Sequence, residues 1–399
     1  MDDRELGRRI GYWRRRRGFT QVIFADLIGR SKSWVVKVEG GYRSAARLDI
    51  LDDICQVLRV DLSTLIGEEP SRQAQVCLDD ADTERIQSAL ENYSVAGVTE
   101  DRPYGIDALR GRVRYAWTAF EYADYTTVSL TLPDLIMAGR KTFQASQDVL
   151  AREMLIEIYQ IASSTLRKLG EPSLAWLAGD RGMALSQNLE TPALSVATGF
   201  RVANALLSLG RARQAKELAV SLAERIQAES RDESNRALYG HVMLQAAVAA
   251  ATADDEDRAS VQDLIGEARD AARHVTTQHD HYHLEFGKTN VSLHEVTILL
   301  AQGEGGRAVQ AANSIDEFEL RKLRKERRAA LRVDVARAYN QIGERDQALR
   351  NLIEAERIAP REVRCRPVAQ AAISDLMRRA RGAPSFTLEQ LAARAGVKN

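Results

Sequence analysis

The sequence has few of the residues that mark secreted, metal-binding or membrane-spanning proteins. Its three cysteines, Cys55, Cys77 and Cys365, lie far apart and form no CxxC pair, so neither a zinc site nor a disulfide framework is indicated. No run of 18 uncharged apolar residues occurs, and residues 1–4 do not open an apolar signal segment. These absences predict a cytoplasmic protein that does not associate with membranes.

The motifs of common enzymes are also missing. The chain has no P-loop, no GxSxG, no HExxH and no dinucleotide fingerprint, so we expect no enzyme, no catalytic residues and no cofactor. A histidine cluster runs from His274 to His294, and His279 and His283 could pair on one helix face. No cysteine joins the cluster, and a polar helix start explains it equally well. No metal site is predicted.

The charge of the chain is balanced overall but unevenly distributed. The 399 residues contain 56 basic and 56 acidic side chains. Residues 1–47 hold 12 Lys/Arg against 5 Asp/Glu, whereas residues 48–102 hold 4 against 13. This length and this shift predict three segments: a basic N-terminal domain over 1–67, an acidic linker with a short helix over 68–103, and a larger domain over 104–399.

The first segment has the pattern of a compact, all-α domain of five helices. Apolar residues recur at helical spacing in short stretches that Gly18, Gly29 and Gly40-Gly41 interrupt. One helix begins after Thr20 and ends before Gly29, and Ser31 caps the next, which reaches Glu39. The sequence therefore predicts two helices joined by a tight turn.

This segment, TQVIFADLIGRSKSWVVKVEGGYR, resembles the Cro/repressor (XRE) class of helix-turn-helix domains. In that class, which has a lambda-repressor-like fold, the second helix enters the major groove. The resemblance implies that Arg14 pairs with Glu39. It also implies that lysine, serine and valine side chains meet the bases and that further polar groups bind phosphates. The DNA-binding residues expected on this basis are Gln21, Ser31, Lys32, Ser33, Val36, Lys37, Tyr42 and Arg43.

Beyond residue 104 the chain consists of helix-forming residues in a repeating pattern. Ala336, Tyr339, Gly343, Ala348 and Pro360 fall where a tetratricopeptide (TPR) unit places its small, aromatic, glycine, alanine and proline residues. The step Gly-x4-Ala recurs at Gly170, Gly210 and Gly303, with room for one degenerate unit near residues 247–259. We expect a TPR-like α-solenoid, and we interpret residues 386–397 as a terminal capping helix or a dimerisation element. A generic helical bundle is the alternative.

A repressor-type head joined to such a body resembles the RRNPP group of regulators, in which the repeat groove binds a short signalling peptide. If each first helix of a repeat lines the groove at every third or fourth position, polar side chains gather there. Asparagine suits peptide binding, because its amide both donates to and accepts from one backbone unit. The ligand-binding residues expected are Gln160, Arg167, Asn204, His241, Asn290, Arg337 and Asn340, although each could equally be a solvent-facing polar residue.

The sequence thus predicts a transcriptional regulator that binds a double-stranded DNA operator as a homodimer, since one such head reads few bases. A signalling peptide or other ligand in the repeat groove would modulate operator binding. The alternative is a protein-interaction scaffold that its helix-turn-helix head localises to DNA.

Overall fold

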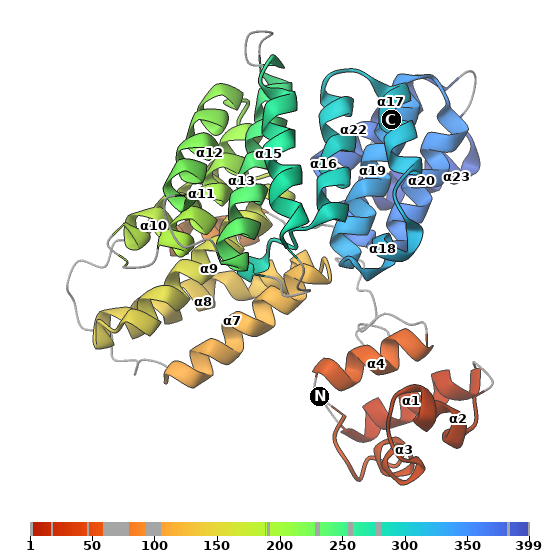
Figure 1. Ribbon diagram of the computed structural model, residues 1–399. Helices are drawn as coiled ribbons and strands as arrows, with labels where there is room; N and C mark the ends of the chain where they lie inside the picture. The colour runs from red at the N-terminus through yellow and green to blue at the C-terminus, as the bar shows by residue number, and fades with distance from the viewer. Residues whose placement is uncertain are drawn as a thin grey trace. The chain divides into compact units, whose positions relative to one another are not determined.

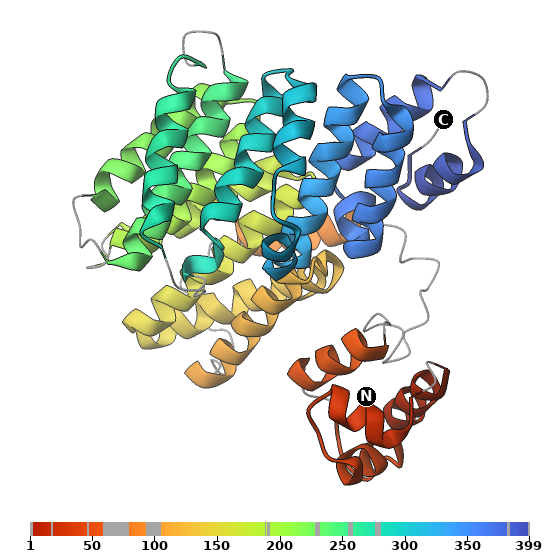
Figure 2. The same cartoon turned by 45° about the vertical axis from the view of Figure 1, so that its right-hand side comes forward.

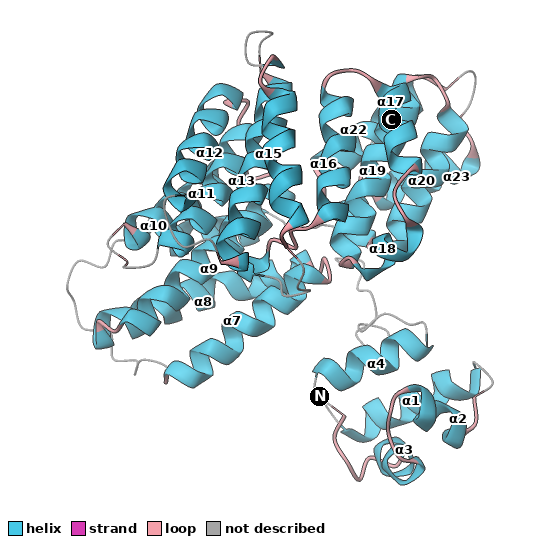
Figure 3. Cartoon of the chain, in the orientation of Figure 1, coloured by secondary structure: helices cyan, strands magenta, loops and turns pink. Residues whose placement is uncertain are grey.

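The computed structural model describes residues 3–16, 19–45, 48–58, 80–92, 105–187, 189, 192–227, 232–253, 258–275, 281–380 and 384–397. Within these ranges the regular structure is entirely helical, as predicted (Figure 3). The chain divides into two compact units, residues 1–74 and 75–399. None of the helices in the described part combines the length and the apolar character needed to cross a bilayer.

The N-terminal unit contains four helices in its described part: α1 (Asp3–Arg16), α2 (Gln21–Leu27), α3 (Lys32–Glu39) and α4 (Leu48–Leu58) (Figure 1). The fifth helix expected before residue 67 falls outside the described residues. Apolar residues from all four helices are buried together, including Leu6, Phe24, Val35 and Ile54. This small core holds α2 and α3 in a fixed relation.

Helices α1 and α3 approach each other closely at Gly7. A Cβ atom on Gly7 would lie 2.0 Å from the carbonyl oxygen of Val38 and 3.1 Å from the carbonyl carbon of Glu39. Both atoms belong to backbone, which cannot move aside as a flexible side chain can. Glycine is therefore required here, although it is a poor helix former.

Gly7→Ala is expected to destabilise the N-terminal unit by about 2 kcal/mol or more, because an added methyl group overpacks a closed backbone contact. Hydrogen exchange of peptides covering residues 3–39 in the full chain measures the effect. Gly111→Ala is the matched control, since Gly111 lies within a helix and nothing lies within 4 Å of its added Cβ. It should stabilise by about 0.5–1 kcal/mol. Equal exchange in the two variants would contradict the close approach.

The C-terminal unit is built from consecutive helix pairs, as the repeat pattern predicted (Figures 1 and 2). The first helices of the pairs contact one another in order: α7 (Ile106–Glu121), α9 (Val149–Lys168), α11 (Pro192–Ser208), α13 (Glu233–Thr252), α16 (Lys288–Ala301), α19 (Lys325–Gln341) and α22 (Pro367–Arg378). Each packs on its own second helix: α8 (Tyr125–Ser146), α10 (Pro172–Ser186), α12 (Ala212–Gln227), α15 (Val261–Arg273), α17 (Gly305–Asn313), α20 (Arg345–Ile358) and α23 (Phe386–Arg394). This arrangement is that of a TPR-like solenoid.

The turns inside the pairs share one backbone geometry. The repeat glycines Gly170, Gly210, Gly303 and Gly343 have φ between 74° and 89°, which is the left-handed region. In each case the amide after the glycine donates to the carbonyl five residues earlier at 2.9 Å, as in a Schellman motif. Ala123, with φ 58°, takes the glycine position between α7 and α8. The pair α7 and α8 is therefore an earlier, divergent unit of the repeat.

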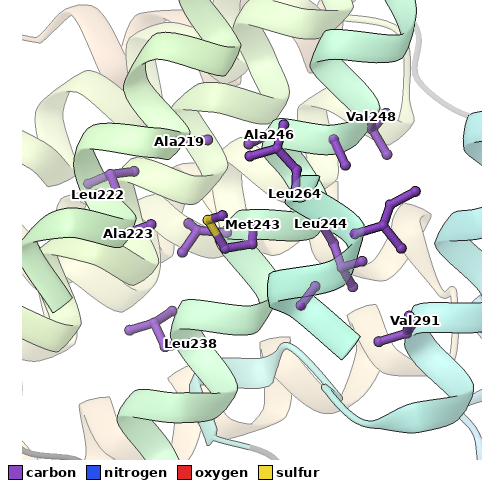
Figure 4. Packing of buried hydrophobic residues seen from close by; sticks show 14 of the residues in the cluster. Ala219, Leu222, Ala223, Leu238, Met243, Leu244, Ala246, Val248, Leu264 and Val291 are labelled. Atoms are coloured by element: carbon purple, nitrogen blue, oxygen red, sulfur yellow. The ribbon is translucent and has the colours of Figure 1, made fainter. Parts of the chain in front are cut away.

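Small side chains let the paired helices approach. The alanines five residues after the repeat glycines are buried. The small or branched residues seven positions before the same glycines are buried as well, namely Ser163, Ala203, Val296 and Ala336. In the centre of the unit, Met243 and Leu244 of α13 pack between α12 and α15 in one apolar cluster (Figure 4). Neighbouring pairs thus bury a continuous core, which is the source of stability in repeat arrays.

The two ends of the solenoid are covered by α6 (Asp80–Glu91), which precedes the first pair, and by α23, the second helix of the last pair. The helix predicted inside the connector forms as α6, and its Ile86, Ala89 and Leu90 are buried with residues of α7, α8 and α9. It is therefore part of the C-terminal unit. At the other end Leu388 and Leu391 of α23 are buried against α19, α20 and α22, which makes α23 a capping helix.

One expectation from the cysteine spacing is not met. Cys365 is disulfide-bonded. The wide spacing of three cysteines carried no signal for this bond, because a disulfide depends on proximity in the fold.

The solenoid curls until its early helices meet its late ones. Lys168 at the end of α9 lies between Glu326 of α19 and Glu362 of α21 (Pro360–Arg364), and its Nζ donates to both carboxylates, at 2.9 Å for Glu362. The hydroxyl of Tyr125 donates to Glu362 as well. All four side chains are buried. This buried cluster, called the closing network below, joins residues more than 150 positions apart.

Candidate DNA-binding surface and ligand cavity

The inner side of the curled solenoid forms a partly open cavity of about 90 Å³. Its lining comes from the first helices of successive pairs, α7, α9, α11, α13, α16 and α19, and from the segment before α16. Five basic side chains line it, and one acidic side chain does: Arg167, Lys168, Arg201, Arg324, Arg327 and Glu326. The cavity is therefore strongly basic.

Several of these charges already have partners. Lys168 belongs to the closing network, and Arg324 lies 2.9 Å from the carboxylate of Glu121. Burial would raise the pKa of Glu326, but the ammonium of Lys168 and the guanidinium of Arg327 outweigh it, so this pKa lies well below its ordinary value. Glu326 is thus a carboxylate within a positive environment.

Two histidines of the cavity are uncharged at neutral pH. His241 is buried, and burial together with the nearby charge of Arg327 holds its pKa well below the ordinary value. Burial lowers the pKa of His294 to about 4. The Nδ1 atom of His294 lies 2.9 Å from the carbonyl oxygen of Asn290, whereas neither ring nitrogen of His241 has a hydrogen-bond partner.

An irregular segment of the chain, residues 282–287, lies along the cavity and is called the strap here. The carbonyl of Tyr282 accepts from Arg201 at 2.8 Å, and that of Leu284 accepts from Arg327 at 3.3 Å. The ring of His283 stacks on Trp117 with centroids 4.0 Å apart. Tyr282, His283 and Glu285 all have φ near +55°, a costly conformation outside glycine. Contacts with three helices, α7, α11 and α19, thus hold a strained backbone on the inner side.

The cavity brings together three of the seven expected ligand-binding residues, namely Arg167, Asn204 and His241. The other four lie elsewhere. Gln160 donates to the hydroxyl of Thr198 on α11 at 2.8 Å, Asn290 is buried, Arg337 pairs with Asp334, and Asn340 donates to Asp375. The cavity also contains Arg201 and Gln245, which lie one helical turn from the expected Asn204 and His241. It contains Arg327 as well, which donates to the strap, a segment that the repeat pattern does not predict.

The histidine cluster of the sequence does not form a metal site in the described residues. No three His, Cys, Asp or Glu side chains gather there in a way that could hold an ion. His283 and His294 both line the cavity, and His279 lies outside the described residues.

In the N-terminal unit α2 and α3 form the predicted pair of capped helices. The hydroxyl of Thr20 accepts from the amide of Ile23, and that of Ser31 accepts from the amide of Trp34, both at 3.2 Å. Gly29 makes the turn with φ 63°. Ala25 and Val35 are buried at the contact between the helices.

The ion pair between Arg14 and Glu39 forms as the resemblance implied. The Nε atom of Arg14 donates to Glu39 at 2.6 Å and one terminal nitrogen donates at 3.0 Å, so the contact is bidentate. Arg14 also donates to the carbonyl of Phe19 at 2.7 Å, and Gln21 donates to Glu39 at 2.9 Å. This network joins α1, the start of α2 and the end of α3.

Comparison with known families agrees with this geometry. Residues 5–65 match the model of a family described as a helix-turn-helix domain. The N-terminal unit contains a helix-turn-helix domain. None of the curated proteins matches the chain.

Solved structures similar to the chain include PlcR from Bacillus thuringiensis, solved with the peptide PapR7 and DNA, at 16% identity. That match covers 68% of this chain and 95% of PlcR, with a TM-score of 0.33. ComR from Streptococcus suis matches at 16% identity over 94% of this chain and 95% of its own, with a TM-score of 0.27. ComR from S. thermophilus, in its apo form, matches at 13% identity over 79% and 96%, with a TM-score of 0.20.

The helix-turn-helix domain exposes one face of α3. Lys32, Ser33, Val36 and Lys37 are exposed, whereas Trp34 is only 7% exposed and packs in the core, with the guanidinium of Arg30 over its ring. Trp34 therefore belongs to the core of the domain and not to the exposed face of α3.

A depression of about 310 Å³ lies at the start of α3 in the helix-turn-helix domain. Four expected residues line it: Ser31, Ser33, Lys37 and Arg43. Arg30 also lines it and was not among the expected residues. Tyr42 is 83% exposed, and Gln21 is turned towards Glu39.

Proposed function

We propose that this chain is a sequence-specific transcriptional regulator that binds a DNA operator as a homodimer through α3 of its helix-turn-helix domain. The observation that carries the proposal is the exposed face of α3, where two lysines, a serine and a valine stand on a helix that a bidentate ion pair and a small core hold in place. Lysine donates to guanine O6 and N7, and valine offers a methyl surface to thymine.

Phosphate contacts would set the register of α3. Ser31, Tyr42, Arg43 and Arg30 surround the start and the end of α3 and carry the donors that phosphate oxygens accept. The free amides at the N-terminus of α3 add a favourable partial charge towards the same groups. Dimerisation would supply the second half-site, since one such domain reads only a few bases.

The cavity of the C-terminal unit would be the regulatory site. Lys168 and Glu326 line it and also belong to the closing network. A bound ligand would therefore change the strength of the ion pair that joins α9 to α19. A ligand can shift an equilibrium only by its different affinity for two states, and the curled and less curled solenoid supply those states in this proposal. The shift would alter how freely the two DNA-binding domains of the dimer can move.

Replacing Lys32 and Lys37 together with alanine is expected to weaken binding to the preferred operator about 100-fold, since each base contact contributes about 1–3 kcal/mol. In vitro selection from random duplexes identifies the operator, and fluorescence anisotropy of the full chain at fixed salt measures affinity. The double variant Arg225→Ala and Lys288→Ala removes the same charge from exposed sites of the C-terminal unit and should bind normally. Selection that returns no preferred sequence, or equal loss in both variants, contradicts the proposal.

A further inference from the structure

We infer that the cavity lined by α9, α11, α13 and the strap is a binding site for a small organic oxyanion, a carboxylate or phosphate compound, and not for an extended peptide. The inference deepens the proposed function, on which its regulatory meaning rests. Its binding chemistry depends only on the residues of the cavity.

The first argument is charge. Among the residues that the structure describes, no carboxylate lies within salt-bridge distance of Arg167 or Arg201, although both line the cavity. Arg201 is 4% exposed, donates only to the carbonyls of Ala197 and Tyr282, and keeps its Nε–H without a partner. Burial lowers the pKa of Arg201 to about 9, while the charge of Glu157 favours the cation. The ring of Trp117, 5.4 Å from the guanidinium, compensates only in part. The cavity therefore holds two guanidinium groups that carboxylates influence at a distance but that no ion pair within the described part of the chain neutralises directly.

The second argument is unused hydrogen-bonding capacity. Gln245 is 3% exposed and its amide nitrogen has no partner, and both ring nitrogens of buried His241 are also unpartnered. Buried polar groups are nearly always hydrogen-bonded, so these atoms point to an occupant. Arginine and the amide nitrogen of Gln245 are donors, and a neutral histidine supplies one more. A set dominated by donors fits an acceptor-rich, negatively charged ligand.

The third argument is size. A volume of about 90 Å³ has room for roughly six water-sized groups. The strap contacts Arg201, Arg327 and Trp117 with its own backbone carbonyls and the ring of His283, so it takes the contacts that an extended peptide would make there. A compact acid fits without displacing it.

Isothermal titration calorimetry of the full chain tests the inference at constant ionic strength. The probes are inorganic phosphate, succinate and benzoate, with succinamide and benzamide as uncharged counterparts. We expect at least one anion to bind at a single site per chain and its uncharged counterpart not to bind. If none of the anions binds, or if the amides bind as well as the acids, the inference is wrong.

Two variants localise the site. Arg167→Gln should weaken the bound anion about tenfold or more, because a charge-assisted hydrogen bond is lost. Gln245→Met should also weaken it while raising the melting temperature of the free protein, since it removes an unsatisfied buried amide. If Gln245 had only a structural role, its replacement would not lower the affinity for the anion while raising the melting temperature. Arg225→Gln, on the exposed side of α12, is the matched control and should bind normally. Wild-type affinity in both cavity variants overturns the inference.

Operator affinity measured on the same preparations separates the two proposals. Sequence-preferring DNA binding without anion binding overturns the anion site alone. Anion binding that the cavity variants weaken, in a chain that prefers no DNA sequence, supports the anion site and overturns the regulator.

Discussion

Lys168→Met is expected to lower the free energy of unfolding of the C-terminal unit by about 3–5 kcal/mol, the cost of removing one partner from a buried ion pair. The side chains of Lys168, Glu326 and Glu362 are 4%, 8% and 0% exposed. Without the ammonium, two buried carboxylates lose a common counter-ion. Arg366, 2.8 Å from Glu362, and Arg327, 3.6 Å from Glu326, would compensate only in part.

The pH dependence of this variant distinguishes a lost charge from a packing defect. In the native chain the pKa of Glu326 is depressed, so its contribution to stability is present above the ordinary value of 4.5 and is lost as the pH falls below it. In the variant, burial without the ammonium raises this pKa. Protonation would then relieve the buried charge, and the stability of the variant should increase as the pH falls from about 7 towards about 5.

Denaturant unfolding followed by circular dichroism at several pH values measures both effects. Lys288→Met is the matched control, because Lys288 is exposed on α16 and lies outside the closing network. It should change stability by no more than about 0.5 kcal/mol. If the loss of stability in Lys168→Met does not depend on pH, a packing defect and not the lost charge explains it.

Most of the fold follows from local signals in the sequence. Gly343 and the residues around it predict one pair of helices, and the same step at Gly170, Gly210 and Gly303 predicts three more. These positions are informative because only glycine adopts a left-handed turn without strain, and because small residues must lie where helices touch. The degenerate pair α13 and α15 also occurs in the predicted gap.

The closing network and the strap were not predictable in this way. Lys168, Glu326 and Glu362 are ordinary charged residues of helical segments, and only the curvature of the whole solenoid brings them together. That curvature also explains why Gln160 and Asn340 lie away from the cavity. Neighbouring first helices pack closely enough for these amides to reach across to Thr198 and Asp375, so they connect helices where a more open groove would expose them.

The surface of α3 proposed to bind DNA was easier to predict from the sequence, because a short segment specifies it. Thr20, Gly29 and Ser31 fix two helices and a turn within about a dozen residues, and the exposed positions of α3 follow from its helical period. Gln21 is the exception. It was expected at a phosphate, but it donates to Glu39, a contact that depends on where α1 places Arg14.

Glu39→Ala is expected to destabilise the N-terminal unit by about 3 kcal/mol, because it leaves the guanidinium of Arg14 buried without its counter-ion. Arg14 is 7% exposed, and its remaining partner would be the carbonyl of Phe19. Gln21 would also lose its acceptor. Since Glu39 holds α1 against α3 and does not belong to the exposed face of α3, operator preference should change far less than stability.

Thermal unfolding and in vitro selection on the same variant test both halves of this expectation. Asp26→Ala is the matched control, since Asp26 is an exposed carboxylate on α2, and it should leave the melting temperature nearly unchanged. An unchanged melting temperature in Glu39→Ala would mean that the bidentate pair does not stabilise the domain. A changed operator with normal stability would mean that Glu39 takes part in reading the bases, and the face of α3 assigned to DNA would then have to be extended to its C-terminal end.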